Sequence, residues 1–492
     1  MANKRNRFTG GYRFARFAGQ PHAQIVAADI PPLVTMDLRA AGPAPVRIQV
    51  EPGQPIEAGA LIARDDEAEG NPIPASVNGT IEEIRNRADA IPVVTIRSDG
   101  TAAWKPVEGH SENWNELEPQ RLEQLLYRSG AAGSVPGGIP TRYKSACVYP
   151  AEVNHILLQL VAAEVFNPDV ATVIGTENLE AVAQGLAVLA RIMPHSELHL
   201  VGGRSRKTLL PAMRQACGKY GINRITLDTV EDRYPNHREE ILIPALLGLK
   251  YPHGRSALDL GVLFLDLHAV LAVRDAVVAG KPAIERVIAL AGGELPHRPH
   301  VRARIGTPVE RLLAPYLNAD RPHRIIRNSL LTGQSLHGSV VDPHMTALIV
   351  AAEGAPNPPL AFSRPGFRTD SISRTFVANF LPFEKTVDTN IHGEQRPCIS
   401  CAYCDSVCPV GILPHLLHRY VQRGLLDERA VRYGIFDCID CNLCTYVCTS
   451  KIPLARLMRE GKQRLIDEGL GPRPAGADPG GRELPSPSEA KP

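Results

Sequence analysis

Eight of the ten cysteines of this 492-residue chain lie in two runs near its carboxyl end, and no other feature constrains the fold as strongly. Each run has the spacing CxxCxxC and then a fourth cysteine after three more residues. The runs consist of Cys398, Cys401, Cys404 and Cys408, and of Cys438, Cys441, Cys444 and Cys448. A cubane iron–sulfur cluster needs four thiolates in one small volume; CxxCxxC supplies three of them, and a remote cysteine supplies the fourth. The sequence therefore predicts two [4Fe–4S] clusters.

Zinc binding and disulfide bonds are the other uses of cysteine at this spacing. A zinc site takes two pairs of ligands, which would leave the third cysteine of each CxxCxxC idle. Disulfide frameworks are typical of small secreted domains. The start of the chain, MANKRNRFTGGYRFARFAG, is basic but has no apolar core long enough for a secretory signal. Clusters are therefore favoured.

The two runs resemble those of two-cluster ferredoxins, in which the fourth ligand of each cluster comes from the opposite run, often just before a proline. Pro409 follows the first run, whereas Thr449 follows the second. The resemblance implies two ligand sets: Cys398, Cys401, Cys404 and Cys448 for one cluster, and Cys438, Cys441, Cys444 and Cys408 for the other.

The stretch between the runs predicts two helices. Leu413 and Leu417 keep helical spacing, Gly424 can end the first helix, and Asp427 can cap the second. Residues 396–468 are therefore expected to form a helical two-cluster ferredoxin domain. Because such clusters span potentials of about −700 to +450 mV, the motif predicts electron transfer without its direction.

Charge and hydropathy exclude several partners. The chain has 54 basic and 52 acidic residues, so no nucleic-acid surface is indicated. No run approaches the ~20 apolar residues that a membrane-spanning helix needs. A soluble or peripheral protein in a reducing cytoplasm is expected, with about three to four domains.

The first domain, residues 1–108, is expected to be β-rich. Val46, Ile48 and Val50 alternate with polar residues at strand period. The stretch VEPGQPIEAGALIA resembles the hairpin of biotinyl and lipoyl carriers, which implies a barrel-sandwich hybrid. The turn between its halves, DDEAEGNPIPASVNG, has no lysine for a carrier function. A docking or lid domain is expected instead.

Residues 109–284 predict an α/β domain with a mostly parallel sheet, since the strand-like stretches ATVIG, ELHLVGG and NRITLDTV alternate with helices. This part also holds a glycine-rich loop that ends in Ile139, Pro140 and Thr141. Because glycine lacks a Cβ atom, the N–H groups of such a loop can approach a phosphate. An ordinary surface turn is the alternative.

The order of these parts resembles the C subunit of the Rnf electron-transport complexes, which is similar to the NADH-binding flavoprotein subunit of respiratory complex I. That family has a GxGGAGFPT loop around FMN, followed by an acidic stretch associated with NADH. Val135 and Pro136 stand where the family has a glycine pair, and both glutamates of the acidic stretch are absent. FMN and NADH therefore stay open as cofactors. The resemblance assigns four residues to FMN: Gly133, Gly137, Gly138 and Thr141.

Other segments extend this resemblance. The α/β part is also similar to the A subunit of the sodium-translocating NADH:quinone oxidoreductase, which lacks the NADH site. Residues 285–354 resemble the β-grasp SLBB domain of the family, with a helix that starts at Pro308. His297 and His300 are expected to be solvated in a loop of this domain. Residues 355–395 are expected to be a linker, and the Pro- and Gly-rich tail 469–492 to be disordered.

The expected fold is thus multidomain, of mixed α/β and α+β class. The resemblance implies a peripheral subunit on the cytoplasmic face of the inner membrane, in an Rnf- or Nqr-type oxidoreductase or translocase. It would pass electrons from NADH or a ferredoxin-like donor through the clusters to other subunits. Two alternatives stay open: an electron-transfer scaffold without NADH or FMN chemistry, and a subunit of a soluble flavin-based oxidoreductase. No catalytic residue is expected.

Overall fold

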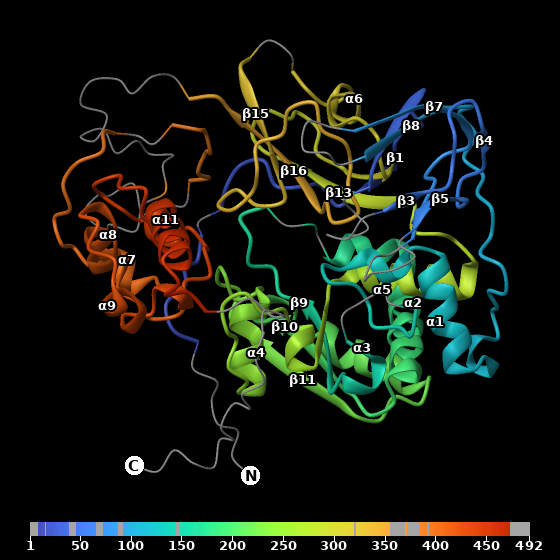
Figure 1. The fold of residues 1–492 in the computed structure, drawn as a ribbon, viewed down its shortest axis with the longest axis horizontal. Coiled ribbons are helices and arrows are strands. Elements are labelled where there is room, and N and C mark those ends of the chain that lie inside the picture. The colour runs from blue at the N-terminus through green and yellow to red at the C-terminus, as the bar shows by residue number, and fades with distance from the viewer. Residues whose placement is uncertain are drawn as a thin grey trace.

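The computed structural model describes residues 8–472, with gaps at 15, 39–45, 65–71, 87–91, 144–147, 167, 169, 319–320, 355–369, 371–380, 382 and 391–392. The chain folds into three parts that contain sheets and one small helical part (Figure 1). Within the described residues, no helix is long and apolar enough to cross a bilayer. Most of the expected linker and nearly all of the expected disordered tail lie outside the described residues.

The N-terminal part consists of two small antiparallel sheets around one hydrophobic core. Val34 and Ile96 from the first sheet and Ile62 from the second are fully buried in this core. Buried and less buried residues alternate along the first strand, as expected for a strand with one face in the core. The strands in spatial order are β2 (Leu33–Asp37), β8 (Pro92–Ser98), β7 (Gly79–Asn86) and β4 (Pro55–Ile56), and then β3 (Arg47–Ile48), β5 (Leu61–Arg64) and β6 (Ile73–Pro74).

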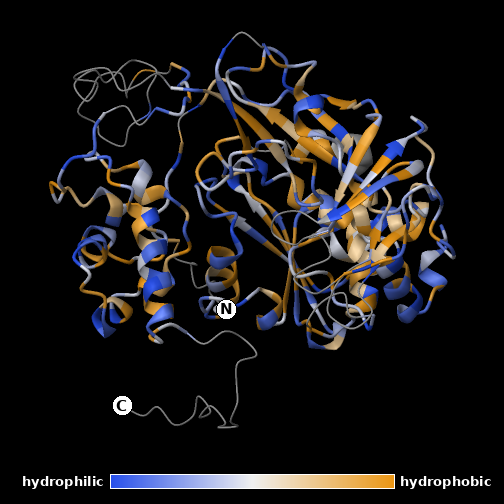
Figure 2. Ribbon diagram, turned by 45° about the horizontal axis from the view of Figure 1, so that its top comes forward, coloured by the Kyte–Doolittle hydropathy of each residue, from blue (hydrophilic) through white to orange (hydrophobic). Residues whose placement is uncertain are grey.

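A four-stranded parallel sheet with helices on both faces forms the central part. Ile156 belongs to the core beneath α2 (Val170–Ile192) and α5 (Leu267–Arg274), whereas Leu157 belongs to the core beneath α4 (Glu239–Leu247). Burial on both faces explains why the strands His155–Leu160 and Val262–Leu265 read as nearly continuous hydrophobic runs, and Figure 2 shows hydrophobic residues concentrated along the strands. The strand order is β11 (Ile225–Val230), β10 (Glu197–Gly203), β9 (His155–Leu160) and β12 (Val262–Leu265).

The prediction of a strand at ATVIG is wrong. These residues, 171–175, lie in α2, which begins at Val170 and continues through the helix expected further on. The strand at this place in the chain is β9, which precedes the helix. Periodicity cannot separate a short apolar run in a helix from a short buried strand. The remaining helices of this part are α1 (Pro119–Arg128) and α3 (Leu209–Gly218).

The third part is a five-stranded mixed sheet with the short helix α6 (Val309–Leu313), which Pro308 precedes as the N-cap residue. β1 pairs in parallel with β14, although it precedes the N-terminal β part in the chain. The expectation that His300 is solvated in a loop is wrong: it begins β14 and is fully buried. The strand order is β1 (Ile25–Ala27), β14 (His300–Arg304), β13 (Glu285–Ala291), β16 (Ala347–Ala352) and β15 (His323–Arg327).

The C-terminal part is helical, as predicted. Gly424 ends the first long helix with a φ of 65°, and the Asp427 carboxylate accepts a hydrogen bond from the Arg429 N–H at 2.8 Å. Both helix signals read from the sequence are thereby confirmed. The helices are α7 (Tyr403–Ser406), α8 (Pro414–Gln422), α9 (Glu428–Arg432), α10 (Leu443–Tyr446) and α11 (Leu454–Asp467).

An N-terminal arm lies between the C-terminal part and the central part and contacts both (Figure 1). The Gly11 N–H donates to the Val407 carbonyl at 2.8 Å, and Tyr12 forms a β-bridge with Tyr234. The Tyr12 ring also makes an edge contact with Tyr446. The arm is therefore in direct contact with both the central and the C-terminal part.

Candidate metal centres

The eight cysteines of the two runs line two separate cavities in the C-terminal part. Each cavity receives three cysteines from one run and the fourth from the other run. None of the nine described cysteines forms a disulfide. The first cavity is lined by Cys398, Cys401, Cys404 and Cys448, and the second by Cys438, Cys441, Cys444 and Cys408.

The backbone around the two cavities repeats itself. Ser400 and Asp440, which precede the second cysteine of each run, have φ values of 56° and 55°. Ala402 and Asn442, which follow that cysteine, have φ values of 59° and 64°. L-residues visit this left-handed region rarely and as single residues, and strained positions of this kind gather at functional sites. The repeated bends let each loop bring its three sulfur atoms to one side.

Main-chain N–H groups face several of the sulfur atoms. The Ser400 N–H donates to Cys398 Sγ and the Ile452 N–H to Cys448 Sγ, each at 3.4 Å. Such donors favour the charged thiolate over the neutral thiol.

Burial opposes the thiolate form. It raises the pKa of Cys404 and of Cys438 to about 12 and that of Cys441 to about 11. Burial and then the neighbouring thiols also raise the pKa of Cys444 well above its usual value. Such crowded thiols lose their protons when a metal supplies compensating positive charge. The donor set in each cavity therefore fits a metal centre.

The two cavities differ in their surroundings. Cys401 of the first cavity is exposed, and the neighbouring Ile399 is 69% exposed. At the second cavity, the Tyr234 hydroxyl donates to the Cys441 carbonyl at 2.8 Å, and Asn442 Nδ2 donates to the Leu331 carbonyl at 2.7 Å. The first cavity thus lies near the surface, and the second is anchored to the rest of the protein.

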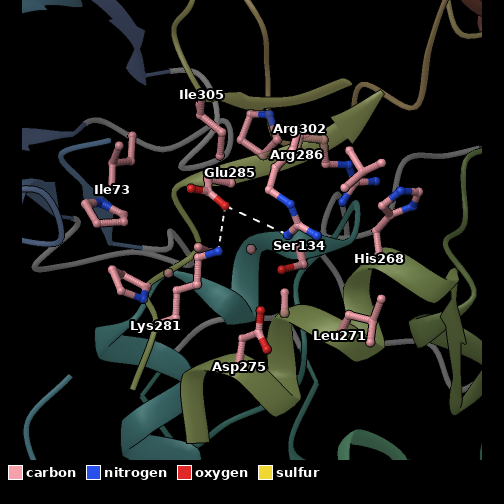
Figure 3. A pocket seen from close by; sticks show the side chains of 18 of the residues that line it. Ile73, Ser134, His268, Leu271, Asp275, Lys281, Glu285, Arg286, Arg302 and Ile305 are labelled. Atoms are coloured by element: carbon pink, nitrogen blue, oxygen red, sulfur yellow. Dashed lines mark hydrogen bonds and ion pairs between the residues drawn. The ribbon is translucent and has the colours of Figure 1, made fainter. Parts of the chain in front are cut away.

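The four residues assigned to FMN lie in different environments. Gly133 lines the space drawn in Figure 3, together with Ser134 of the same loop. Gly137 is exposed, with a φ of 82°, whereas Gly138 and Thr141 are buried. Only Gly133 among the four lines this space.

The cavity in Figure 3 has a volume of about 110 Å³, less than the roughly 300–1,000 Å³ typical of a cofactor site. Its cationic side chains already have carboxylate partners. Lys281 Nζ lies 2.6 Å from Glu285 Oε2, and Arg302 Nη1 lies 3.9 Å from the same atom. Arg286 Nη2 lies 3.1 Å from Asp266 Oδ2. Within the described residues, this arrangement does not fit FMN.

Sequence reasoning missed these charged residues. Lys281, Glu285 and Arg286 lie in the stretch KPAIER, whose pattern in the chain indicates only packing and turns. The only sign of a charged site in the sequence was the group of opposite charges at Lys281, Glu285 and Arg286, where a strand begins. Arg302 is distant in the sequence, and only the folded sheet brings it to the same place.

Comparison with known proteins supports the cysteine assignment. Residues 394–452 match the family model described as "4Fe-4S dicluster domain". The match spans both cysteine runs and favours iron–sulfur clusters over zinc. The C-terminal part is therefore an iron–sulfur domain.

The similarity to known proteins extends over most of the chain. The C subunit of the "Ion-translocating oxidoreductase complex" of Pseudomonas aeruginosa is 30% identical over 435 residues, which are 86% of this chain and 51% of that protein. The protein of the same name from Actinobacillus succinogenes is 26% identical over 404 residues, 80% of this chain and 52% of that protein. This chain thus spans about half the length of these relatives.

A solved structure of an NAD+-reducing [NiFe]-hydrogenase also matches, with a TM-score of 0.39 and 14% identity over 51% of this chain and 52% of that chain. A likeness of this size supports no argument about function. The sequence matches are stronger, and they confirm the resemblance predicted from the motifs. Over four-fifths or more of its length, this chain is similar to the C subunit of the ion-translocating oxidoreductase complexes, the Rnf type.

Proposed function

We propose that this chain is an electron-transfer subunit of an Rnf-type ion-translocating membrane oxidoreductase. The observation that carries the proposal is the pair of four-cysteine cavities within a domain of the iron–sulfur dicluster type. A [4Fe–4S] cluster supplies reversible one-electron transfer when it is bound. Two such clusters in one small domain suit a stepwise relay.

The proposed ligands follow the lining of the cavities. Cys398, Cys401, Cys404 and Cys448 hold one cluster, and Cys438, Cys441, Cys444 and Cys408 hold the other. The cavities are close neighbours, since α7, which contains Cys404, contacts α10, which contains Cys444. The protein binds the clusters through thiolates, directs N–H groups at the sulfur atoms and surrounds them with buried apolar side chains. These contacts tune the reduction potential.

The proposed route connects the protein surface to the anchored second cavity. Exposed Cys401 and Ile399 give a partner protein access to the first cluster. The soluble donor and the acceptor, another subunit of the complex, are inferred from the resemblance. A ferredoxin-like carrier can give single electrons to the clusters directly, whereas NADH, a hydride donor, would need a bound flavin. The same holds for a peripheral position on the cytoplasmic face of the membrane.

The glycine-rich loop favours the alternative of an electron-transfer scaffold without FMN or NADH chemistry. Val135 and Pro136 replace the glycine pair of the family, and proline removes an N–H donor. The nearby cavity is small and its cations are paired. No step through FMN is therefore part of the proposed relay.

The domain types proposed for the other parts are a barrel-sandwich hybrid over 1–108, a flavoprotein-like α/β domain over 109–284 and a β-grasp SLBB-like domain over 285–354.

Anaerobic purification with measurement of iron, acid-labile sulfide, zinc and flavin tests the proposal. We expect about eight iron and eight sulfide per chain, since each [4Fe–4S] cluster has four of each. A colourless protein that contains zinc and no sulfide would contradict it. Bound flavin that is lost in Gly137→Val would restore the loop as an FMN site. Recovery in a membrane fraction with other subunits separates the membrane complex from a soluble oxidoreductase.

A further inference from the structure

We propose a second kind of metal site in the central part, in which His155, Glu197 and His199 bind one divalent ion of the zinc class. His155 is the first residue of β9 and Glu197 the first residue of β10, and the two are direct partners in the parallel register. His199 follows two positions along β10, so its side chain points to the same face of the sheet. Three ligating side chains therefore meet at the edge where these strands begin.

The ligand atoms have the spacing of a metal site. His155 Nδ1 lies 3.1 Å from His199 Nε2, and Glu197 Oε2 lies 4.0 Å from the same nitrogen. One ligand atom from each of the three residues lies within 4.8 Å of the others. Two ligands at ~2.0–2.2 Å from a tetrahedral zinc ion are separated by roughly 3.3–3.6 Å. The two separations at His199 Nε2 differ from this range by a few tenths of an ångström, and the third separation is at most 4.8 Å.

His199 is oriented for this role by a neighbour on the next strand. It is only 5% exposed, and its Nδ1 atom is buried without a hydrogen-bond partner, 3.7 Å from Asp228 Oδ2 on β11. Metal-bound imidazoles usually donate their other N–H to a carboxylate, which sets the tautomer and the ring orientation. Asp228 is placed to accept that N–H.

Glu197 is held in the same way. The Thr226 hydroxyl donates to Glu197 Oε1, which leaves Oε2 on the side of the histidines. The other carboxylate oxygen, Oε2, is therefore left for a metal ion.

A hydrogen bond between the two imidazoles is the alternative arrangement, and it leaves a buried nitrogen unsatisfied. If His199 Nε2 accepts from His155, the buried Nδ1–H of His199 lacks an acceptor at hydrogen-bond distance. If His199 Nε2 donates, Nδ1 is a buried acceptor without a donor. Either tautomer leaves one buried nitrogen unsatisfied, at a cost of about 1–3 kcal/mol. With a metal ion at Nε2 the proton lies on Nδ1, which faces Asp228 Oδ2 at 3.7 Å.

The site is separate from the other features of the protein. His155, Glu197 and His199 line neither cysteine cavity nor the cavity of Figure 3. Two imidazoles and a carboxylate suit zinc, and three protein ligands leave the fourth position to water. The ion would link the starts of β9 and β10, and the inference does not depend on the proposed electron transfer.

Metal analysis of the cluster-loaded protein tests this site. The anaerobically purified protein is freed of loosely bound metal with a mild chelator, dialysed against Zn²⁺, and analysed for zinc and iron together. We expect about one zinc per chain in the wild type and none in His155→Gln or His199→Gln, with the same iron content in all. His195→Gln is the matched control, since His195 is an exposed histidine next to β10, and it should keep the zinc.

Two further measurements keep the outcome decisive. X-ray absorption at the zinc edge should show only nitrogen and oxygen at about 2.0–2.2 Å, whereas sulfur at about 2.3 Å would assign the zinc to cysteines and overturn the site. Asp228→Asn keeps all three ligands and should weaken zinc binding about 10–100-fold, even if the histidine variants fail to fold. Equal zinc affinity in the wild type and Asp228→Asn, or a wild type without zinc, would also overturn it.

Discussion

The buried hydroxyl of Tyr234 donates a hydrogen bond to the main-chain carbonyl of Cys441, 2.8 Å away, across 207 positions of the chain. Tyr234 lies between β11 and α4 of the central part and is 1% exposed. Burial raises the pKa of this hydroxyl far above its usual value, so it stays a donor at every physiological pH. This contact couples the second cysteine loop to the central part.

Tyr234→Phe should destabilise this junction. The substitution keeps the ring but leaves the Cys441 carbonyl unsatisfied, which costs about 1–3 kcal/mol. We expect a lower thermal midpoint and faster loss of iron to a chelator. Tyr220→Phe removes a more exposed hydroxyl that donates to Glu180 and serves as the control. Equal rates of iron loss in the two variants would show that the Tyr234 contact does not support the loop.

Gly10→Ala should displace the N-terminal arm from the second cavity. A Cβ atom on Gly10 would overlap with the carbonyl oxygen of Cys408, and its φ of 58° already disfavours other residues. Gly53 also has a positive φ, 85°, but a Cβ atom there would meet nothing within 4 Å. Gly53→Ala should therefore cost only about 1 kcal/mol, the penalty of the left-handed backbone.

The comparison between these two alanine variants isolates the contact with Cys408. We expect a lower thermal midpoint and easier loss of iron in Gly10→Ala than in Gly53→Ala. The same behaviour in both would mean that the arm does not hold the loop.

Single cysteine variants can test the exchange of the fourth ligand between the runs. Cys401→Ser and Cys448→Ser should weaken the same cluster, because both line the first cavity. Cys441→Ser and Cys408→Ser should weaken the other cluster. Electron paramagnetic resonance of the reduced proteins should therefore give two residual spectra, shared within each pair. Cys217→Ala, in α3, is the control and should keep both signals. A spectrum of Cys448→Ser that matches that of Cys441→Ser would refute the exchange.

The stability of the central part should fall as the pH drops from about 7 to 5. Burial, and then Arg286, lowers the pKa of His268, which lies on α5 with a side chain that is 10% exposed. The unfolded chain, with a histidine pKa near 6.5, takes up a proton in this range while the native state does not. Stability due to this group is present above about pH 6.5 and declines below it by up to about 1.4 kcal/mol per pH unit.

His268→Gln removes this proton uptake, so unfolding should depend less on pH than in the wild type. Urea unfolding at several pH values, under anaerobic conditions, measures the effect. His195→Gln changes an exposed histidine and should keep the wild-type slope. An unchanged slope in His268→Gln would mean that the proton is taken up elsewhere, for example at His344, whose pKa is also lowered by burial.

The features that the sequence predicted well are those decided by neighbours in the chain. Cysteine spacing, the glycine stop at Gly424 and the cap at Asp427 are local signals, and each was found where expected. Contacts between distant segments could not be read this way. Gly10 against Cys408 and β1 beside β14 depend on tertiary packing, and the burial of His300 follows from that pairing.

Among the candidate site residues, too, those marked by a local pattern were predictable and those brought together by tertiary structure were not. The cysteines were found because thiolate chemistry needs a narrow spacing, whereas glycine at Gly137 and Gly138 is compatible with an ordinary turn. His155 and Glu197 are separated by a long helix, and only the parallel register makes them neighbours. No local pattern in the sequence points to that pair.

The exchange of the fourth ligand has a consequence for the growing polypeptide. During synthesis, the cavity that Cys408 shares with the second run has all its cysteines once Cys444 has emerged from the ribosome. The other cavity has all its cysteines only after Cys448 has emerged, although Cys398, Cys401 and Cys404 are made earlier. Iron and sulfide can therefore fill the later run first, and a nascent chain halted just before Cys448 would hold one finished centre and one open one.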